Sequence, residues 1–267
     1  MVVSVRQSRN VRGHAGEPLP TVWESFDRIG ARFLRGQLAM IAAAPGVGKS
    51  ALALSYALQA GVRTMYFSAD SDATEQIGRA SSILTGAPLA DTKAEFIAGE
   101  IRDEVQRAPI YWSFNAQPTL DDIDEEIDAL YEAYLWEPEV VVIDNLTNVL
   151  SGFAGNEEDP FGGLEALLDH LNGLARRTGA CVIATHHVTG PHNDGVTAIP
   201  LSGLKGQVGR VPQMVLTVHK RQAVGEFSPD MLVVSLVKNR GSKSDPTGRM
   251  TAELELDGDR MQLKDLV

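Results

Sequence analysis

The residues best suited to chemistry in this chain form one short loop that can hold phosphate groups. The loop reads Ala43-Ala44-Pro45-Gly46-Val47-Gly48-Lys49-Ser50 and is followed by Ala51. It matches the phosphate-loop pattern except at its first position, where Ala43 replaces glycine. The glycines let backbone N–H groups curl around phosphate oxygens, Lys49 supplies a positive charge, and the Ser50 hydroxyl can ligate Mg²⁺. We therefore predict that residues 44–51 bind a nucleotide; a helix-opening turn without a ligand is the alternative.

Acidic residues that follow two apolar runs are candidates for supporting a metal and for activating water. Asp144 ends the run VVVI, and a carboxylate at the tip of a buried strand is costly unless it meets a cation or donors. We predict that it supports Mg²⁺; an aspartate capping a turn before Asn145 is the alternative. Asp70 follows YFSA and is placed to orient or deprotonate an attacking water, or to cap a helix. Glu75 is the other candidate base, but a solvated helix face explains it better.

Two adjacent histidines, His186 and His187, follow the apolar run ACVIAT. A metal site is a weak interpretation, because neighbouring residues point to opposite sides of an extended chain. We predict that His186 contacts the γ-phosphate and couples it to the long loop that follows. Ordinary packing or solvation of this side chain is the alternative.

A basic motif lies near the C-terminus, where Lys238-Asn239-Arg240 ends the run LVVSLV. Lys238 and Arg240 stand at alternate positions, so they share one face of the strand end. There they can reach the phosphates of a nucleotide held by a neighbouring subunit and stabilise transition-state charge, as an arginine finger does. The alternative is a solvated strand end followed by a turn.

Alternating strands and helices are predicted to position these residues. The apolar runs predict strands over 37–43, 63–69, 140–143, 180–185, 214–219, 232–237 and 251–256. Helical spacing predicts helices over 49–60, about 72–84, from Thr119 to near Pro138, and 164–177, and Thr119 with Asp122 resembles a capping box. This order implies an α/β fold with a mostly parallel twisted sheet flanked by helices. Ligands of such sheets bind at the carboxyl ends of the strands.

Composition and charge narrow the class of protein. The chain has 267 residues, 43% hydrophobic and 22% charged, so it is neither disordered nor fibrous. No apolar stretch approaches the roughly 18 residues of a membrane span, and no signal peptide is recognisable, so we expect a soluble cytoplasmic protein. The single cysteine, Cys181, excludes an internal disulfide and a cysteine-based zinc site. A net charge of −11 argues against a broadly basic surface for nucleic acid but leaves room for a local basic channel.

The chain divides into a short polar start and one domain. Residues 1–20 are rich in arginine, glycine and proline, and we expect an arm or linker there. Residues 21–267 are expected to form one ATPase domain, and residues 188–209 read as a long functional loop.

The motifs AAPGVGKS, YFSAD, VVVIDN, ATHH and VKNRGSKSDPTG together resemble the RecA-type P-loop ATPase core. The strongest likeness is to the motor domain of DnaB-type replicative helicases and to short plasmid RepA-like hexameric helicases, over about residues 20–262. The resemblance implies ATP hydrolysis with Mg²⁺ and movement on single-stranded DNA during DNA replication. It also implies a homo-oligomer, a hexameric ring, with other replication proteins as further partners. The chain has no room for a separate primase-contacting domain, so we expect a bare motor.

The resemblance assigns roles by position. It gives phosphate and Mg²⁺ to Lys49 and Ser50, support of Mg²⁺ to Asp144, the sensor position to His186, and the finger acting in trans to Lys238 and Arg240. Asp70 falls where the family usually has a catalytic glutamate. Because its side chain is one methylene shorter, we expect slow hydrolysis.

The family's DNA-facing loops correspond to about residues 147–159 and 188–209. The first loop has no basic residue, whereas the second contains Lys205, with Arg210 just beyond. We predict that Lys205 and Arg210 contact DNA; surface charge on a loop is the alternative.

Two other functions stay open at this point. One is a recombination or repair ATPase like RecA or RadA. The other is a regulatory or loader ATPase like KaiC, which binds ATP as an assembly switch without unwinding DNA. The acidic net charge and Asp70 favour the second of these slightly.

Overall fold

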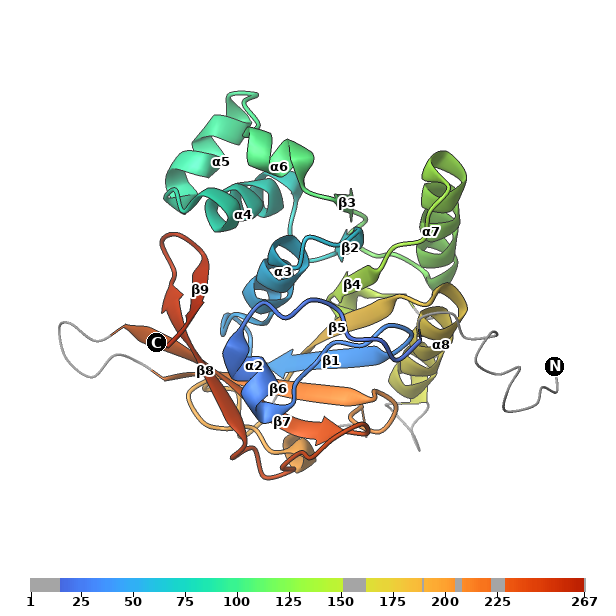
Figure 1. The fold of residues 1–267 in the computed structure, drawn as a ribbon, viewed down its shortest axis with the longest axis vertical. Coiled ribbons are helices and arrows are strands. Elements are labelled where there is room, and N and C mark those ends of the chain that lie inside the picture. Colours follow the sequence, from blue (N-terminus) through green and yellow to red (C-terminus); the bar gives the residue numbers. More distant parts are fainter. Residues whose placement is uncertain (1–14, 151–161, 189, 205–207, 222–228, 267) are drawn as a thin grey trace.

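A single mixed sheet organises the chain (Figure 1). The structure is a computed structural model that describes residues 15–150, 162–188, 190–204, 208–221 and 229–266. Within these residues the strand order is β3-β2-β4-β5-β1-β6-β7-β8-β9. The strands are β1 (Leu38–Ala43), β2 (Thr64–Ser68), β3 (Ile110–Ser113), β4 (Val140–Asp144), β5 (Cys181–His187), β6 (Met214–Arg221), β7 (Asp230–Asn239), β8 (Thr251–Asp257) and β9 (Gln262–Asp265). Strands β3 through β6 in this order are parallel, and β7, β8 and β9 are antiparallel, which confirms the predicted mostly parallel α/β sheet.

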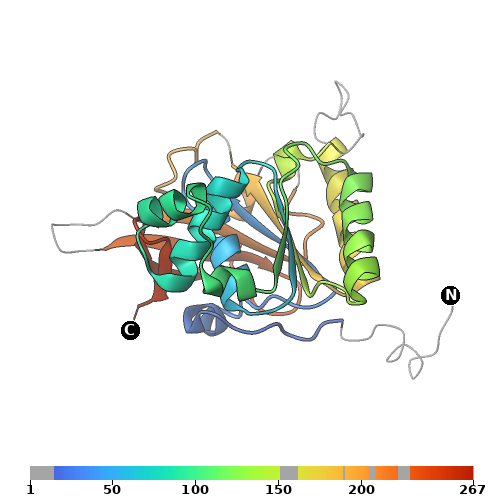
Figure 2. The ribbon, with the colours of Figure 1, turned by 90° about the horizontal axis from the view of Figure 1, so that it is seen from above.

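Helices cover both faces of the sheet, as Figure 2 shows. They are α2 (Glu24–Ile29), α3 (Lys49–Gln59), α4 (Ala73–Thr85), α5 (Leu89–Ile97), α6 (Asp103–Arg107), α7 (Leu120–Tyr134) and α8 (Gly162–Thr178), with short 3₁₀ turns η1 (Leu146–Asn148) and η2 (Leu201–Gly203). One apolar cluster joins the sheet to α2, α3 and α4, and a second joins its other face to α7 and α8. Burial on both faces explains why the central strands read as continuous apolar runs. None of these helices, within the described parts of the chain, has the length and apolar character that crossing a bilayer requires.

Local sequence signals set the ends of the long helices. The predicted capping box is confirmed: Thr119 Oγ1 accepts from the N–H of Asp122 at 3.0 Å, and Asp122 Oδ2 accepts from the N–H of Thr119 at 2.8 Å. Helix α4 begins after Asp72, whose Oδ1 accepts from the N–H of Glu75 at 2.9 Å. The cap of α4 is therefore Asp72, which leaves Asp70 free of that role.

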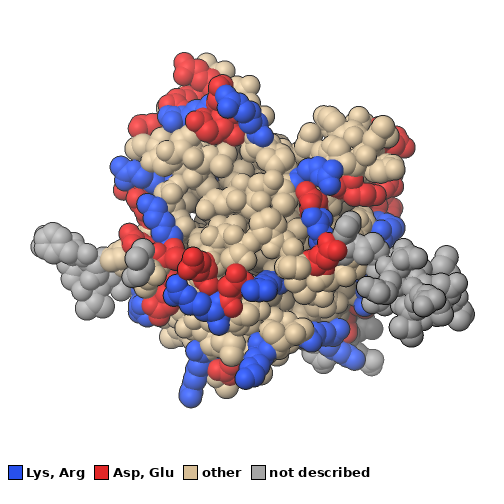
Figure 3. All heavy atoms as spheres, viewed as in Figure 1, with Lys and Arg blue, Asp and Glu red and all other residues tan. Residues whose placement is uncertain are grey.

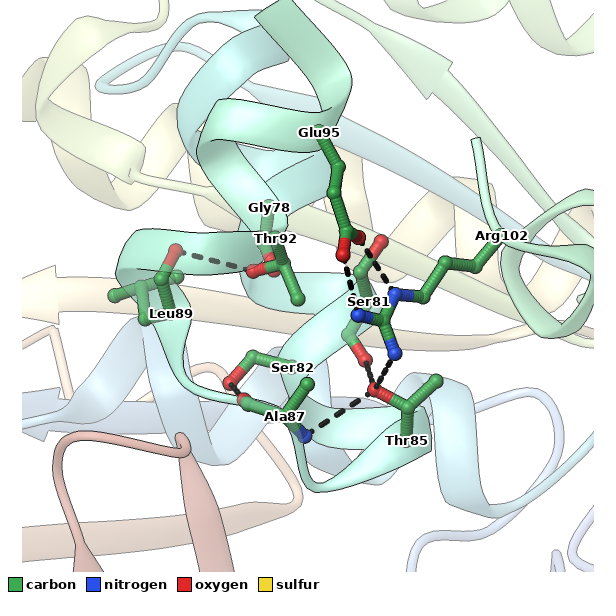
Figure 4. Close-up of polar contacts among 9 residues, drawn as sticks. All are labelled: Gly78, Ser81, Ser82, Thr85, Ala87, Leu89, Thr92, Glu95 and Arg102. Atoms are coloured by element: carbon green, nitrogen blue, oxygen red, sulfur yellow. Dashed lines mark hydrogen bonds and ion pairs between the residues drawn. The ribbon is translucent and has the colours of Figure 1, made fainter. Parts of the chain in front are cut away.

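The small helical unit α4–α6 includes two helices that the sequence did not predict. Arg102 donates to both carboxylate oxygens of Glu95 at 2.6 Å, and its remaining amino group lies 3.4 Å from Thr85 Oγ1 (Figure 4). Thr92 Oγ1 donates to the carbonyl of Gly78 at 2.8 Å, which ties α5 to α4. Helices α5 and α6 were missed because they are short, so little periodicity marks them.

The predicted arm over residues 1–20 is only partly described. Its residues 15–20 pack on the domain: the N–H of Gly16 donates to Arg35 O at 2.7 Å, and the N–H of Leu19 donates to Phe33 O at 2.9 Å. Leu19 is buried in the core. Residues 15–20 thus belong with the domain rather than with a free arm, and residues 1–14 lie outside the described residues.

Candidate nucleotide-binding site

The predicted phosphate loop connects the central strand β1 to the first turn of α3. All six residues of β1 are buried, and β5 and β6 pair with it on either side. Gly46 and Gly48 have φ of 73° and 120°, which favour glycine and let the backbone curl over the helix N-terminus. Lys49 is the first residue of α3 and is buried. Burial lowers the pKa of Lys49, against the attraction of Asp144 and Asp70.

The residues predicted to hold Mg²⁺ are in direct contact. Ser50 Oγ donates to Asp144 Oδ1 at 2.9 Å. A hydroxyl and a carboxylate are the hard oxygen ligands that Mg²⁺ takes beside substrate phosphates, so the pair fits the ion. Two further hydroxyls reach the same carboxylate: Thr185 Oγ1 at 2.6 Å from Oδ1 and Tyr66 Oη at 2.9 Å from Oδ2. Burial, and then Asp144, raise the pKa of Tyr66, so its hydroxyl stays protonated.

A second polar cluster lies at the carboxyl ends of β2, β4 and β5. Asn145 Nδ2 donates to Asp70 Oδ2 and lies 3.1 Å from His187 Nε2. His187 Nε2 is also 3.6 Å from Asp70 Oδ2. The Asp70 side chain is 39% exposed, so solvent reaches the carboxylate that is predicted to activate water. Sequence reasoning missed Asn145 as a partner of Asp70.

Strand alternation brings His187, and not His186, into this cluster. Cys181 and Ile183 pack with α3, and Thr185 reaches Asp144, so His187 continues the face that carries the phosphate loop. His186 lies on the other face of the strand end. Burial, with the nearby His187 and Lys49, lowers the pKa of His186 to about 4. The structure therefore places His187, rather than His186, beside Asp70 and Asn145, and the γ-phosphate contact of His186 stays a prediction.

Glu75, the other candidate for activating water, forms two ion pairs. Its carboxylate pairs with Arg79 at 2.8 Å and also with Lys93. The expected solvated helix face is therefore an ion-paired one, because the Glu75 side chain is only 29% exposed.

Lys238 and Arg240 lie at the amino ends of the parallel strands, whereas the phosphate loop lies at their carboxyl ends. Strand β7 is antiparallel to β6, and Asn239 pairs with Met214, which in turn lies beside Ala39 at the start of β1. At about 3.3 Å per residue, the four steps from Ala39 to Ala43 put roughly 13 Å between that level and the start of the loop. The two cations are therefore not brought together with the phosphate loop of their own chain.

The contacts of these two cations differ. Lys238 Nζ donates to the carbonyls of Gly209 and Arg210, both at 2.7 Å. Burial and the neighbouring Arg240 lower the pKa of Lys238 to about 8. The Arg240 side chain is exposed and donates to Arg210 O at 2.9 Å. It also lines an open cleft of about 1040 Å³ that contains Arg35, Arg63 and Arg176.

The predicted DNA contacts are described only in part. Lys205 lies outside the described residues, as does much of the loop after Asp144. Arg210 has a side chain 69% exposed and pairs with Glu165 at 3.4 Å. On the face shown in Figure 3, acidic and basic side chains are interleaved rather than gathered into one basic field.

The segment after β5 folds back against the phosphate loop at a glycine. Gly195 has φ of +69°, and a Cβ there would lie 2.5 Å from Val47 Cγ2 and 3.6 Å from Ala44 Cβ. The N–H of Lys220 donates to the carbonyl of Gly195 at 2.7 Å, which holds this position from β6. A side chain at Gly195 must therefore displace the phosphate loop or the segment itself.

We expect Gly195→Ala to weaken nucleotide binding about tenfold. Overpacking costs about 1–3 kcal/mol, and the clash is relieved in part by moving the phosphate loop out of its binding conformation. The measurement is the Kd of a fluorescent ATP analogue. Gly86→Ala is the matched control, since Gly86 has φ of +73° and nothing within 4 Å of its Cβ position. Equal effects of the two substitutions would attribute the loss to backbone strain and contradict the contact with Val47.

A sequence model described as an AAA domain matches residues 24–191. The chain belongs to this AAA domain family. The matched span of the AAA domain includes the phosphate loop, Asp144 and His187, and it ends before Lys238 and Arg240.

Other comparisons extend beyond residues 24–191 and cover most of the chain. The gene 65 protein of Mycobacterium phage L5 is 49% identical over 97% of this chain and 97% of its own length. A protein named probable plasmid replicative DNA helicase, from Chlamydia trachomatis, is 24% identical over 78% of this chain and 48% of its own length. The solved structure of a DnaB-like replicative helicase matches with a TM-score of 0.76 at 17% identity, covering 98% of this chain and 67% of that chain. These matches confirm the predicted likeness to the RecA-type P-loop ATPases, a fold that implies nucleotide binding.

Proposed function

We propose that this chain is an ATP-driven DNA helicase or translocase of DNA replication, which hydrolyses ATP between subunits of a ring and moves on single-stranded DNA. One observation carries the proposal: the phosphate loop lies at the carboxyl ends of the parallel strands, and Arg240 lies at their amino ends. A nucleotide site that uses both needs a second copy of the chain. The fold shared with a DnaB-like replicative helicase supports the motor function.

In this proposal, one subunit supplies the residues that bind ATP. The backbone N–H groups around Gly46 and Gly48, with the Lys49 ammonium, hold the phosphates. Ser50 and Asp144 hold Mg²⁺, which when bound offsets phosphate charge and orients the γ-phosphoryl group.

The same subunit and its neighbour supply the residues for hydrolysis. Asp70, held by Asn145, orients a water for attack on the γ-phosphorus and takes its proton as the bond to the ADP oxygen breaks. His187 contacts the γ-phosphate, and the loss of this contact after hydrolysis changes the position of the segment that begins at Val188. Arg240 of the neighbour, with Lys238 beside it, stabilises the charge that develops on the phosphoryl oxygens.

A DNA-independent function is the second candidate. The net charge of −11, and the pairing of Arg210 with Glu165, favour a regulatory or loader ATPase that uses ATP as an assembly switch. A recombination ATPase of RadA type differs from a helicase in assembly, and electron microscopy with ATP separates a filament from a closed ring.

The experiment that tests the motor is ATP turnover with and without single-stranded DNA, with Lys49→Ala as the blank. We expect DNA to raise turnover at least about tenfold, because ligand binding at the loops must couple to the nucleotide site in a translocase. Nucleotide-dependent assembly with turnover that ignores DNA would reject the motor and support the switch.

A further inference from the structure

The Asp144 carboxylate is enclosed by hydroxyl groups from three different elements. Oδ1 accepts from Ser50 of α3 at 2.9 Å and from Thr185 of β5 at 2.6 Å, and Oδ2 accepts from Tyr66 of β2 at 2.9 Å. Asp144 is 2% exposed. A buried carboxylate is costly unless its oxygens are satisfied, so each of these donors matters to where the group points.

Tyr66 reaches Asp144 along the sheet rather than from directly opposite. Strand β2 pairs with β4 so that Ser68 lies beside Asp144 and Tyr66 lies beside Val142, two residues earlier on the same face. A side chain as long as tyrosine spans this diagonal. The ring is fully buried and packs 5.0 Å from the ring of Trp112, so the position of its hydroxyl is fixed by the core.

The three donors fall into two kinds. Ser50 belongs to the phosphate loop and is itself the predicted ligand of Mg²⁺. Tyr66 and Thr185 lie on the strands either side of β4, and each is fully buried within the sheet. They contact the carboxylate from β2 and β5, the strands on either side of β4, so they set its orientation.

We propose that Tyr66 and Thr185 are positioning residues that lock the Asp144 carboxylate in the orientation in which Oδ1 meets Ser50 and the Mg²⁺ of bound ATP. This inference rests on the proposed role of the site in binding Mg²⁺ with ATP. Tyr66 is the only partner of Oδ2 among the described residues, so without its hydroxyl the carboxylate can rotate away from Ser50. Loss of such a supporting partner typically lowers metal affinity about 10- to 100-fold.

The test is a titration of Mg²⁺ against binding of a fluorescent ATP analogue by the full chain, with a parallel measurement in EDTA. We expect Tyr66→Phe and Thr185→Val each to raise the Mg²⁺ concentration for half-maximal binding about tenfold. Affinity without Mg²⁺ should stay within about twofold, which a general loosening of the core would not allow. Thr185→Ser keeps the hydroxyl and is expected to restore the wild-type Mg²⁺ requirement.

Matched controls come from buried hydroxyls that do not touch Asp144. Tyr56 Oη donates to Pro20 O at 3.2 Å, and Thr217 Oγ1 donates to Ile199 O at 2.7 Å. Tyr56→Phe and Thr217→Val make the same chemical changes and are expected to leave the Mg²⁺ requirement unchanged. An unchanged requirement in Tyr66→Phe and Thr185→Val, or equal shifts in the controls, would overturn the positioning role. If the wild-type chain binds the analogue without any dependence on Mg²⁺, the proposed function of the site fails first, before any variant is compared.

Discussion

Replacing Arg240 with alanine is expected to lower ATP turnover about a thousandfold while leaving ATP binding within about twofold. An arginine that stabilises transition-state charge is worth about 10³ to 10⁵ in turnover. Arg240 contributes nothing to nucleotide binding in its own chain, because it lies at the amino end of the parallel strands, beyond reach of the phosphate loop. The measurement is kcat at saturating ATP together with the Kd of the fluorescent analogue.

The control separates a finger from a surface arginine. Arg260 pairs with Asp257 at 3.3 Å on the surface, so Arg260→Ala is expected to have little effect. Arg240→Lys keeps the charge without the planar fork and is expected to recover only part of the turnover.

Mixing two inactive variants tests whether Arg240 acts on a neighbour. In a mixture of Lys49→Ala and Arg240→Ala subunits, some interfaces pair an intact phosphate loop with an intact Arg240, so turnover should exceed that of either variant alone. A mixture no more active than its parts would place Arg240 outside the nucleotide site of a neighbour.

Asp70→Asn is expected to lower turnover about a hundredfold with little change in ATP affinity. General-base assistance contributes about 10² to 10⁴ in rate, and asparagine keeps the size of the side chain but cannot take a proton. The structure gives Asp70 the required surroundings, since Asn145 and His187 hold it at the strand ends and its carboxylate is partly exposed. The measurement is single-turnover hydrolysis with enzyme in excess over ATP.

Two nearby acids provide the comparison for Asp70. Asp72→Asn makes the same change two residues away, and asparagine caps helices about as well as aspartate, so turnover should stay near wild type. Glu75→Gln removes the charge that pairs with Arg79 and Lys93 and should also retain most turnover. Loss of hydrolysis in Glu75→Gln but not in Asp70→Asn would reverse the assignment.

The long elements of this fold could be predicted from the sequence because each carries a strong local signal. The apolar runs around Ile41, Val142 and Ile183 are central strands buried on both faces, and the Thr119 capping box marks the start of α7. Strands β3 and β9 were missed because each spans four residues and its pairing depends on distant partners.

The site was only partly predictable for a related reason. The phosphate loop is contiguous, so its residues could be found together in the sequence. The choice between His186 and His187 depends on which face of β5 packs against α3. A run that is apolar on both faces does not indicate which face that is. The contacts of Tyr66 and Asn145 join strands far apart in the chain, and only the register of the sheet brings them to Asp144 and Asp70.

The separation of the phosphate loop from Arg240 gives each subunit a head and a tail. With Arg240 acting on a neighbour's nucleotide, as proposed, the contact is heterologous, so two copies related by a two-fold axis cannot satisfy both ends. An open row of copies always ends in one phosphate loop that no arginine faces, and only closure removes this incomplete site. Turnover per subunit then depends on the number of subunits in the row, so the catalytic rate reports the fraction of nucleotide sites that have a neighbour's Arg240.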